Sequence, residues 1–450
     1  MKKESSFLAE VCQLAIPVAL QSMLQASFSI ADQIMIGQLG SVSVAGVGLA
    51  GKFTSIFSVV ISAIGAVAGI MISQYLGQKR SQEARRSLCI NFFLGVGIAA
   101  LFTALCILSP ERIMEFYTQD SATMQAAADY LVIIAGTFLP MAGATMFSTL
   151  FRCLEKAKLP LYASIVSAVL NTGLNYVLIF GKCGFPAMGA KGAAIATVIA
   201  QFANFLFMVF MLFRWDSLFV TQRNCGRMTA RFNWKQYGSM LLPVLVCEIV
   251  WSVGENVYAA IYGHMGTESS AAMTLINPVQ GLMIGALCGL SQAAGVMIGK
   301  KLGSGEYDDA YAASKRLILY GAVGSVVLSA VVVVISPFYV EIYQVGESVK
   351  QLTGQILFAY ALVAPFKVLN MILGSGIIRS GGRTKYVMII DMIGTWIFGV
   401  PLGLMAAFVL KLSVPYVYFI LSLEECVRFG ISMAVFHRRR WMHSLEAVET

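Results

Sequence analysis

Long apolar segments recur throughout this chain, and they constrain its fold more than any other feature of the sequence. The 450 residues are 58% hydrophobic and only 12% charged, whereas a soluble domain carries about 25% charged residues. Segments of about 20 apolar residues are long enough to cross a lipid bilayer, and such segments must be helices or part of a closed barrel. Runs such as Leu317–Ile335 do not alternate between polar and apolar residues, and the sequence therefore predicts helices.

Twelve membrane-spanning helices are predicted in this way. We expect them at residues 11–37, 44–76, 88–109, 122–150, 159–181, 187–213, 236–264, 269–299, 315–335, 349–375, 385–409 and 412–436. The first segment is too long for the apolar core of a secretory signal, so we expect no cleaved signal peptide.

The distribution of basic residues predicts the orientation of these helices. The net charge is +9, and most of the 32 lysine and arginine residues fall in alternate loops and at the two termini. Cytoplasmic loops carry such an excess, so we expect an inner-membrane protein with both termini in the cytoplasm. The same placement indicates topology rather than nucleic-acid binding. The nine cysteines are scattered, and they predict neither a metal site nor a disulfide framework.

The two halves of the chain resemble each other. Pro17 and Gly37 correspond to Pro243 and Gly263 when the chain is aligned with itself. The second span of each half also carries small residues at every fourth position, namely Gly65, Gly69, Ser73 and Gly77, and then Ser291, Gly295, Gly299 and Gly303. Such ladders let helix backbones approach closely in lipid. We therefore expect two parallel six-helix repeats, 1–213 and 236–450, joined by a basic cytoplasmic linker at 214–235.

A single carboxylate interrupts the first apolar segment. Asp32 is the only charged residue between Glu10 and Lys52. Burying a carboxylate in lipid is costly, so an ionisable residue inside a span indicates a functional site. Two alternatives remain open, which are a static hydrogen-bond cluster and an ion pair with Lys52.

Two asparagines in the predicted fifth span lie at about the same depth as Asp32. Asn171 and Asn175 are one helical turn apart, so their side chains share one face of the helix. One carboxylate and two amides can hold a small cation, or can stabilise the carboxylate until it takes a proton.

The predicted seventh span carries two carboxylates, Glu248 and Glu255, on one helical face. Trp251 and Tyr258 fall close to the same face. Carboxylates interleaved with aromatic rings suit a lipophilic cation, because charge neutralisation adds to cation–π contact. The alternatives are that the rings only pack against neighbours and that one glutamate pairs with Lys367.

The segment NTGLNYVLIFGKCGFPAMGAKGAAIAT, residues 171–197, resembles the fifth and sixth spans of the multidrug and toxic compound extrusion (MATE) family. The first span, with Pro17, Asp32 and its IGQLG ending, fits the same pattern. The resemblance covers nearly the whole chain and implies an all-α, MATE-like fold of the MOP superfamily. It also implies a secondary antiporter, without cofactor, that exports organic and often cationic compounds against an inward flow of H⁺ or Na⁺.

The resemblance implies roles for particular residues. In this family an aspartate of the first span and polar residues of the fifth form a cation site, so the candidate coupling residues are Asp32, Asn171, Asn175 and Thr197. Some members have a second acid where this chain has Asn175, which leaves the choice between H⁺ and Na⁺ open. An acidic residue in the seventh span is also implied, and the candidate substrate-binding residues are Glu248, Trp251, Glu255 and Tyr258.

We thus expect a monomer whose partners are small organic cations, H⁺ or Na⁺, and lipid. One rival function is a flippase for lipid-linked intermediates of the same superfamily, which would favour a basic cleft and often two further spans. A membrane-embedded enzyme would need a nucleophile–base pair or a metal cluster, but His264, His437 and His443 all lie outside span interiors. A channel, the third rival, would show conductance without coupling.

Overall fold

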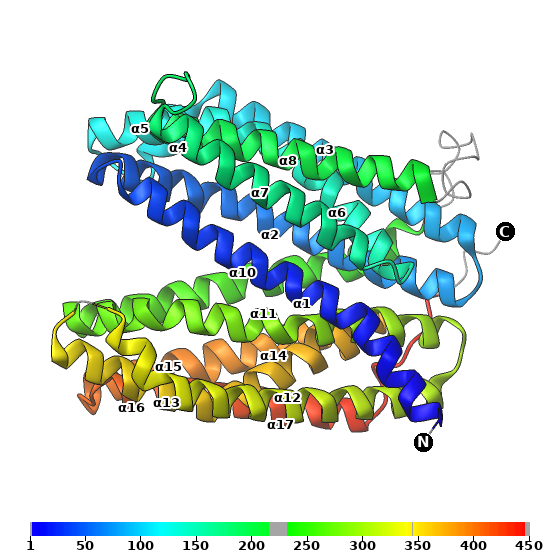
Figure 1. Ribbon diagram of the computed structural model, residues 1–450. Helices are drawn as coiled ribbons and strands as arrows, with labels where there is room; N and C mark the ends of the chain where they lie inside the picture. The colour runs from blue at the N-terminus through cyan, green and yellow to red at the C-terminus, as the bar shows by residue number, and fades with distance from the viewer. Residues whose placement is uncertain (1, 216–231, 344, 446–450) are drawn as a thin grey trace. The chain divides into compact units, whose positions relative to one another are not determined.

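The computed structural model describes residues 2–215, 232–343 and 345–445, and helices account for nearly all of them (Figure 1). No β-strand occurs within these ranges. Helices are the expected outcome because an apolar segment in lipid must satisfy its backbone hydrogen bonds internally. The predicted all-α fold is therefore confirmed.

The first half of the chain forms the six predicted spans. Its elements are α1 (Lys2–Gly37), α2 (Ser41–Gly77), α3 (Ser81–Leu108), α4 (Pro110–Glu115), α5 (Ser121–Ile134), η1 (Ala135–Thr137), α6 (Phe138–Cys153), α7 (Lys158–Phe180) and α8 (Gly189–Trp215). The elements α5, η1 and α6 follow one another without a break and make one span, Ser121–Cys153.

The second half begins with four more spans and ends in shorter elements. These are α10 (Trp234–His264), α11 (Thr267–Gly303), α12 (Tyr307–Glu341), α13 (Glu347–Asn370), η3 (Met371–Ile378), α14 (Lys385–Met392), η4 (Ile393–Gly399), α15 (Val400–Leu404), η5 (Met405–Val409), α16 (Val414–Ser422) and α17 (Glu424–His437). The span Glu347–Ile378 combines α13 with η3, and Lys385–Val409 combines α14 to η5.

Eleven of the described helical segments are long and apolar enough to cross a membrane. The predicted twelfth span, 412–436, corresponds to α16 and α17, which a turn at Leu423 separates. The predicted count of twelve therefore includes one helix that is broken near its middle. This break places Glu424 and Glu425 in the first turn of α17.

Parts of the tenth and eleventh spans are wound as π-helix, namely η3, η4 and η5. Such widened turns are often found at functional sites. Here η3 leads directly into Arg379, and η4 carries Thr395. Arg379 pairs with Glu248, and Thr395 accepts a hydrogen bond from Arg428, which lies among the acidic residues described below.

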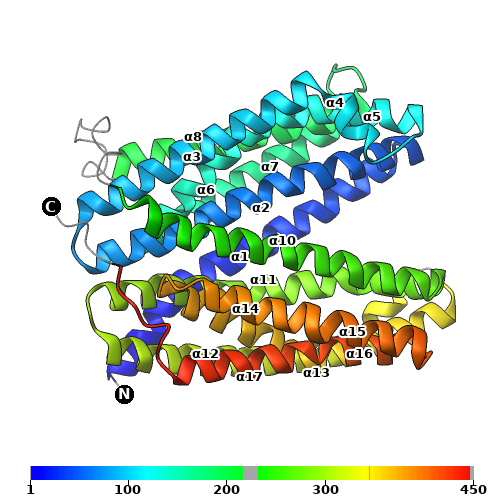
Figure 2. The ribbon, with the colours of Figure 1, turned by 180° about the vertical axis from the view of Figure 1, so that it is seen from behind.

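The helices group into two compact units. The first-half unit comprises Leu20–Ile72 and Ser81–Phe232, and the second-half unit comprises Met1–Ala19, Ser73–Arg80 and Asn233–Thr450. Within the second-half unit α10 packs against α14, and α13 packs against α16 and α17 (Figure 2). Within the first-half unit α7 packs against α8, and α6 packs against α3 and α8. The predicted linker lies mostly outside the described residues, and the division into lobes 1–213 and 236–450 stays a prediction.

The last glycines of the two small-residue ladders lie where α2 and α11 approach closely in the second-half unit. A Cβ atom on Gly303 would lie 2.1 Å from the carbonyl oxygen of Gln74, and one on Gly77 would lie 2.0 Å from that of Lys300. Backbone cannot move aside as a flexible side chain can. The small residues of the ladders thus let α2 and α11 lie in direct contact, and a larger residue at these positions would push the two helices apart.

Replacing Gly303 by alanine is therefore expected to destabilise the protein by about 1–3 kcal/mol through overpacking. Gly281→Ala on the same helix is the matched control, because no atom lies within 4 Å of the position its Cβ would take. Alanine favours helices by up to about 1 kcal/mol over glycine, so this control should be neutral or stabilising. Thermal unfolding of both purified variants in detergent measures the difference. Equal melting temperatures would show that the contact between α2 and α11 is not close.

Candidate functional site

The four predicted coupling residues come together in the first-half unit. Asp32 lies on α1, Asn171 and Asn175 lie on α7, and Thr197 lies on α8. Asn175 Nδ2 donates a hydrogen bond of 2.7 Å to Asp32 Oδ1. The Asn171 side chain contacts Thr197 Oγ1 at 3.2 Å. Equal depth and a shared helical face predicted that Asp32, Asn171 and Asn175 would lie close together, and their side chains do contact one another.

The amide of Asn171 is the second group that contacts Asp32. One of its two polar atoms lies 2.9 Å from both carboxylate oxygens, and the other lies 3.2 Å from Thr197 Oγ1. An ionised carboxylate accepts only, so the atom facing it must then be the nitrogen. In the opposite orientation the Asn171 oxygen faces Asp32 and accepts from Asn175 Nδ2 at 3.3 Å.

One acceptor in this cluster has no partner. Asn175 is 1% exposed, and its Oδ1 atom makes no hydrogen bond in the described part of the chain. Buried polar atoms are normally satisfied, so an orphaned acceptor calls for an explanation such as an absent ion or water. It belongs to the side chain that donates to Asp32 and is therefore a candidate ligand for a cation at this cluster.

Asp32 faces a cavity of about 280 Å³ within the first-half unit. Polar side chains form much of its wall, among them Thr54, Tyr130 and Gln201. Asp32 is the only acidic residue that lines this cavity among the described residues. Lys52 forms no ion pair with Asp32 in the described ranges, so the sequence-based alternative of such a pair is not supported.

The two glutamates of α10 have different surroundings in the second-half unit. Glu248 Oε1 lies 3.4 Å from Arg379 Nη1, and the Arg379 side chain is 9% exposed. Glu255 makes no hydrogen bond or ion pair in the described part of the chain, and it faces a cavity. Glu248 thus has a direct ion-pair partner, whereas Glu255 is exposed and has none among the described residues.

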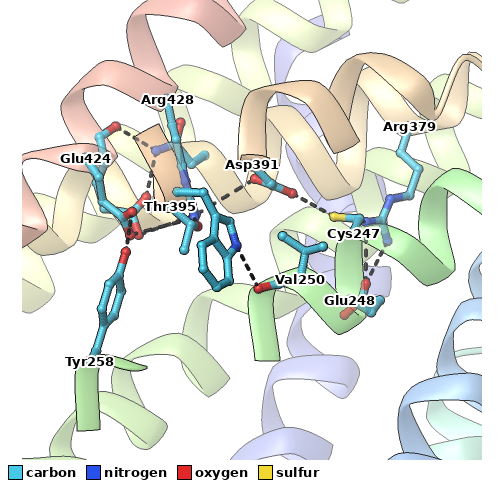
Figure 3. A network of polar contacts seen from close by, with 12 residues as sticks. Cys247, Glu248, Val250, Tyr258, Arg379, Asp391, Thr395, Glu424 and Arg428 are labelled. Atoms are coloured by element: carbon cyan, nitrogen blue, oxygen red, sulfur yellow. Dashed lines mark hydrogen bonds and ion pairs between the residues drawn. The ribbon is translucent and has the colours of Figure 1, made fainter. Parts of the chain in front are cut away.

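Arg428 is the centre of a buried polar network (Figure 3). Its guanidinium lies 3.7 Å from Glu424, 3.8 Å from Asp391 and 3.9 Å from Glu425, and it donates a hydrogen bond to Thr395. Asp391 and Arg428 therefore form an ion pair. It belongs to a larger group that balances one cation against three carboxylates.

Further contacts extend this network along α10 (Figure 3). Tyr258 donates a hydrogen bond of 2.6 Å to Glu424 Oε2. Cys247 Sγ donates to Asp391 Oδ2 at 2.8 Å and lies 3.9 Å from Arg379 Nη2. A continuous polar path therefore runs from Glu424 to the Glu248–Arg379 pair.

The four predicted substrate-binding residues line two cavities rather than one. Glu248 and Trp251 line a cavity of about 280 Å³, and Glu255 and Tyr258 line another of about 260 Å³. The two cavities share Lys367 and Glu425 as lining residues. Lys367 forms no ion pair with either α10 glutamate in the described residues.

The helix α17 contributes more acidic residues to this region than the sequence analysis predicted. Glu424 and Glu425 are 5% and 6% exposed, so both face the protein interior although they are adjacent in the chain. Asn370 Nδ2 donates to Glu425 Oε2 at 2.8 Å. The signal available in the sequence was the presence of two acids and Arg428 within one span, since charges inside spans are costly unless they are paired.

Comparisons with known proteins give one consistent result. The MatE family model matches residues 17–177 and again 243–405, so the two matches begin at the prolines that the internal repeat aligns. The probable multidrug resistance protein NorM of Thermotoga maritima is 24% identical over 396 residues, which cover 88% of this chain and 84% of that protein. An uncharacterized transporter of Bacillus subtilis, YisQ, is 23% identical over 98% of this chain and 95% of its own. Among solved structures, a mutant of the Vibrio cholerae MATE transporter VcmN has a similar fold, with a TM-score of 0.88 at 16% identity over 97% of this chain and 98% of that one.

Proposed function

The chain belongs to the MatE family, and from this premise we propose that it is a multidrug efflux antiporter that exports organic cations in exchange for H⁺ or Na⁺. Members of this family are membrane transporters, so the chain is a polytopic membrane transporter rather than an enzyme. The observation that carries the antiport proposal is the Asp32 carboxylate, which faces a cavity and contacts two amides but no cation within the described residues.

The surroundings of Asp32 suit both of its charge states, which favours a proton as the coupling ion. The Asn171 atom at 2.9 Å from the carboxylate is nitrogen in one amide orientation and oxygen in the other. The nitrogen donates to an ionised carboxylate, whereas the oxygen accepts the proton of a neutral carboxyl. Rotation of a single amide can therefore accompany the uptake and release of one proton.

Sodium is the alternative coupling ion. The carboxylate of Asp32 and the unpartnered Oδ1 of Asn175 are hard oxygen ligands of the kind that alkali and alkaline-earth cations prefer. The hydroxyl of Thr197 adds a third oxygen within the same cluster. In the sodium-coupled mechanism Na⁺ binds at Asp32 in place of the proton, and the mechanism involves no other metal ion.

Glu255 is the proposed contact for the charge of the substrate. It lines a cavity that holds no ion-pair partner for it among the described residues, while Glu248 is engaged by Arg379. Buried tyrosines, including Tyr258 and Tyr262, surround the same cavity and supply aromatic faces for an organic cation. Trp251 lines the neighbouring cavity with Glu248.

The proposed cycle is alternating access. The substrate binds from the cytoplasm, and binding of H⁺ or Na⁺ at Asp32 favours its release outside. Each ligand must bind the inward-open and outward-open forms with different affinity, because a ligand shifts an equilibrium only through such a difference. The excess of basic residues in alternate loops supports an inner-membrane protein with both termini in the cytoplasm. We propose that it works as a monomer.

Transport by the purified chain in proteoliposomes tests this function. The probe is the methyl ester of a rhodamine dye, which is a lipophilic cation, and gradients of pH and of Na⁺ are imposed separately. We expect one of the two gradients to drive accumulation of the dye against its concentration, while liposomes without protein show none. If neither gradient moves the dye, the antiport proposal is wrong, and lipid-linked substrates of a flippase are the next to test.

A further inference from the structure

A short segment that follows α17 crosses the second-half unit and reaches the end of α2 (Figure 2). It comprises residues 438–445, which we call the strap, and it contains no helix. The strap, the loop at 380–382 and the end of α2 at Ser73–Arg80 all belong to the second-half unit. Ordering a segment without regular secondary structure costs conformational entropy, so specific contacts must hold the strap in place.

Aromatic rings anchor the first half of the strap. Trp441 is fully buried. Its ring stacks on that of Phe436 with centroids 5.9 Å apart, and its Nε1 donates to the Phe436 carbonyl oxygen at 3.2 Å. Phe436 in turn stacks on Tyr311 of α12 at 4.8 Å. Arg439 pairs with Asp308 at 2.9 Å. These contacts fix the beginning of the strap to α12 and α17.

Gln74 of α2 holds the second half of the strap. Its side chain is fully buried. Its Nε2 donates to the carbonyl oxygen of His443 at 3.2 Å, and its Oε1 accepts from the backbone nitrogen of Leu445 at 2.7 Å. The same Nε2 donates to the carbonyl oxygen of Ser380 at 2.7 Å. Because a glutamine amide both donates and accepts, this one side chain joins α2, the loop and the strap.

The rest of this contact is equally close. Gln78, one turn further along α2, donates from Nε2 to Ser444 Oγ at 3.0 Å and to the carbonyl oxygen of Leu445 at 3.1 Å. A Cβ atom on Gly381 of the loop would lie 1.9 Å from the carbonyl oxygen of Trp441. The strap is therefore packed against the loop and α2 as tightly as helices pack against each other in the interior.

The helix that the strap holds belongs to both units. α2 is a single helix, in which the residues up to Ile72 belong to the first-half unit and those from Ser73 belong to the second-half unit. It contains no proline and no widened turn, which are common causes of a sharp bend. A change in the arrangement of the two units must therefore lift the end of α2 away from the second-half unit.

We propose that the strap is a latch, which keeps the end of α2 on the second-half unit and must release it before the protein opens to the cytoplasm. The inference rests on the proposed alternating access and adds a conformational step to it. In the proposed topology the strap and the end of α2 both lie on the cytoplasmic side. The transport cycle then requires Gln74 and Gln78 to exchange their bonds with the strap for bonds with water.

A reversible cross-link between the strap and α2 tests the proposal. Gln78 and Ser444, whose side chains are in contact, are both replaced by cysteine and joined by ethanediyl bismethanethiosulfonate, a short thiol reagent. The cross-link should reduce accumulation of the cationic dye to the level of liposomes without protein, and reduction should restore it. Gln78→Cys and Ser444→Cys alone are the matched controls for reaction of the nine native cysteines, and the reagent should leave their transport unchanged.

Hydrogen exchange of the loop at residues 379–385 measures opening without transport. The strap and Gln74 cover this loop, so its amides should exchange when the latch releases. The cross-linked chain in detergent should exchange there at least about 10-fold more slowly than the same protein after reduction. Gln74→Glu should have the opposite effect, because a carboxylate cannot donate to Ser380 and His443. Gln125→Glu, at an exposed glutamine of α5, is its control.

Two results would overturn the inference. The first is cross-linked protein that moves dye at the rate of its reduced form. The second is exchange at residues 379–385 that the cross-link leaves unchanged, since the strap would then be a fixed part of the fold. Failure of the proposed function has a different signature. In that case neither the wild type nor the reduced protein moves dye in either gradient, while slower exchange in the cross-linked protein still supports the latch.

Discussion

Replacing Asp32 by asparagine is expected to abolish accumulation of substrate against its gradient. If one proton is exchanged for each monovalent cation, a gradient of two pH units supports an accumulation of about 100-fold, because each unit is worth about 1.4 kcal/mol. Asparagine has the shape of aspartate, and its Oδ1 can still accept from Asn175 Nδ2, which now donates to Asp32. It can neither take up a proton nor balance the charge of Na⁺, so the accumulation ratio should fall to one.

Accumulation of the cationic dye in proteoliposomes measures this effect, and dye binding in detergent shows whether the variant is folded. Asp129→Asn is the matched control in the same unit, because Asp129 is a surface residue paired with Lys191 at 2.9 Å. It should accumulate dye as the wild type does. Accumulation by Asp32→Asn at the wild-type level would remove Asp32 from the coupling mechanism and would favour the view that the cluster is a static hydrogen-bond network.

Loss of the Arg428 guanidinium is expected to have the largest effect on stability. In Arg428→Met the acids Asp391, Glu424 and Glu425 lose their shared cation. Breaking a buried ion pair on one side costs roughly 3–5 kcal/mol, because the remaining charge stays buried without compensation. We therefore expect low yields of folded protein or a melting temperature well below that of the wild type.

An exposed ion pair provides the comparison for this variant. Lys191→Met breaks the pair with Asp129, where the lysine side chain is 55% exposed, and such pairs contribute about 0–1 kcal/mol. Thermal unfolding in detergent should rank Arg428→Met far below Lys191→Met. Similar melting temperatures for the two would mean that the three acids are protonated or solvated and that Arg428 does not hold the network together.

Glu248 and Glu255 show how much about the surroundings of a side chain can be predicted from the spacing of residues along one helix. Seven residues of spacing place both on one helical face, and both do face cavities of the second-half unit. The residues near them come from elsewhere in the chain: Arg379, which pairs with Glu248, follows η3, and Lys367, which forms no ion pair with Glu255, lies on α13. A helical wheel contains no information about those residues, so it could not distinguish the neutralised glutamate from the free one.

Most of the architecture followed from the sequence because a bilayer imposes length and hydrogen-bonding rules on every segment. The apolar runs located the spans, and the Asp32 cluster could be anticipated because equal depth and a shared face bring Asp32, Asn171 and Asn175 to one level. The repeat that pairs Pro17 with Pro243 was visible in the residues alone, and the family model matches the chain from those two positions.

Tertiary packing decided what each charged group can do. The break at Leu423 turns Glu424 and Glu425 toward the protein interior, and Arg428 then joins them to Asp391. The rotation of each helix about its own axis, and thus the partner each side chain meets, depends on contacts between segments far apart in the chain. Sequence periodicity therefore specified helices and depths, whereas the distinction between a paired charge and one available to a ligand arose only when the helices packed together.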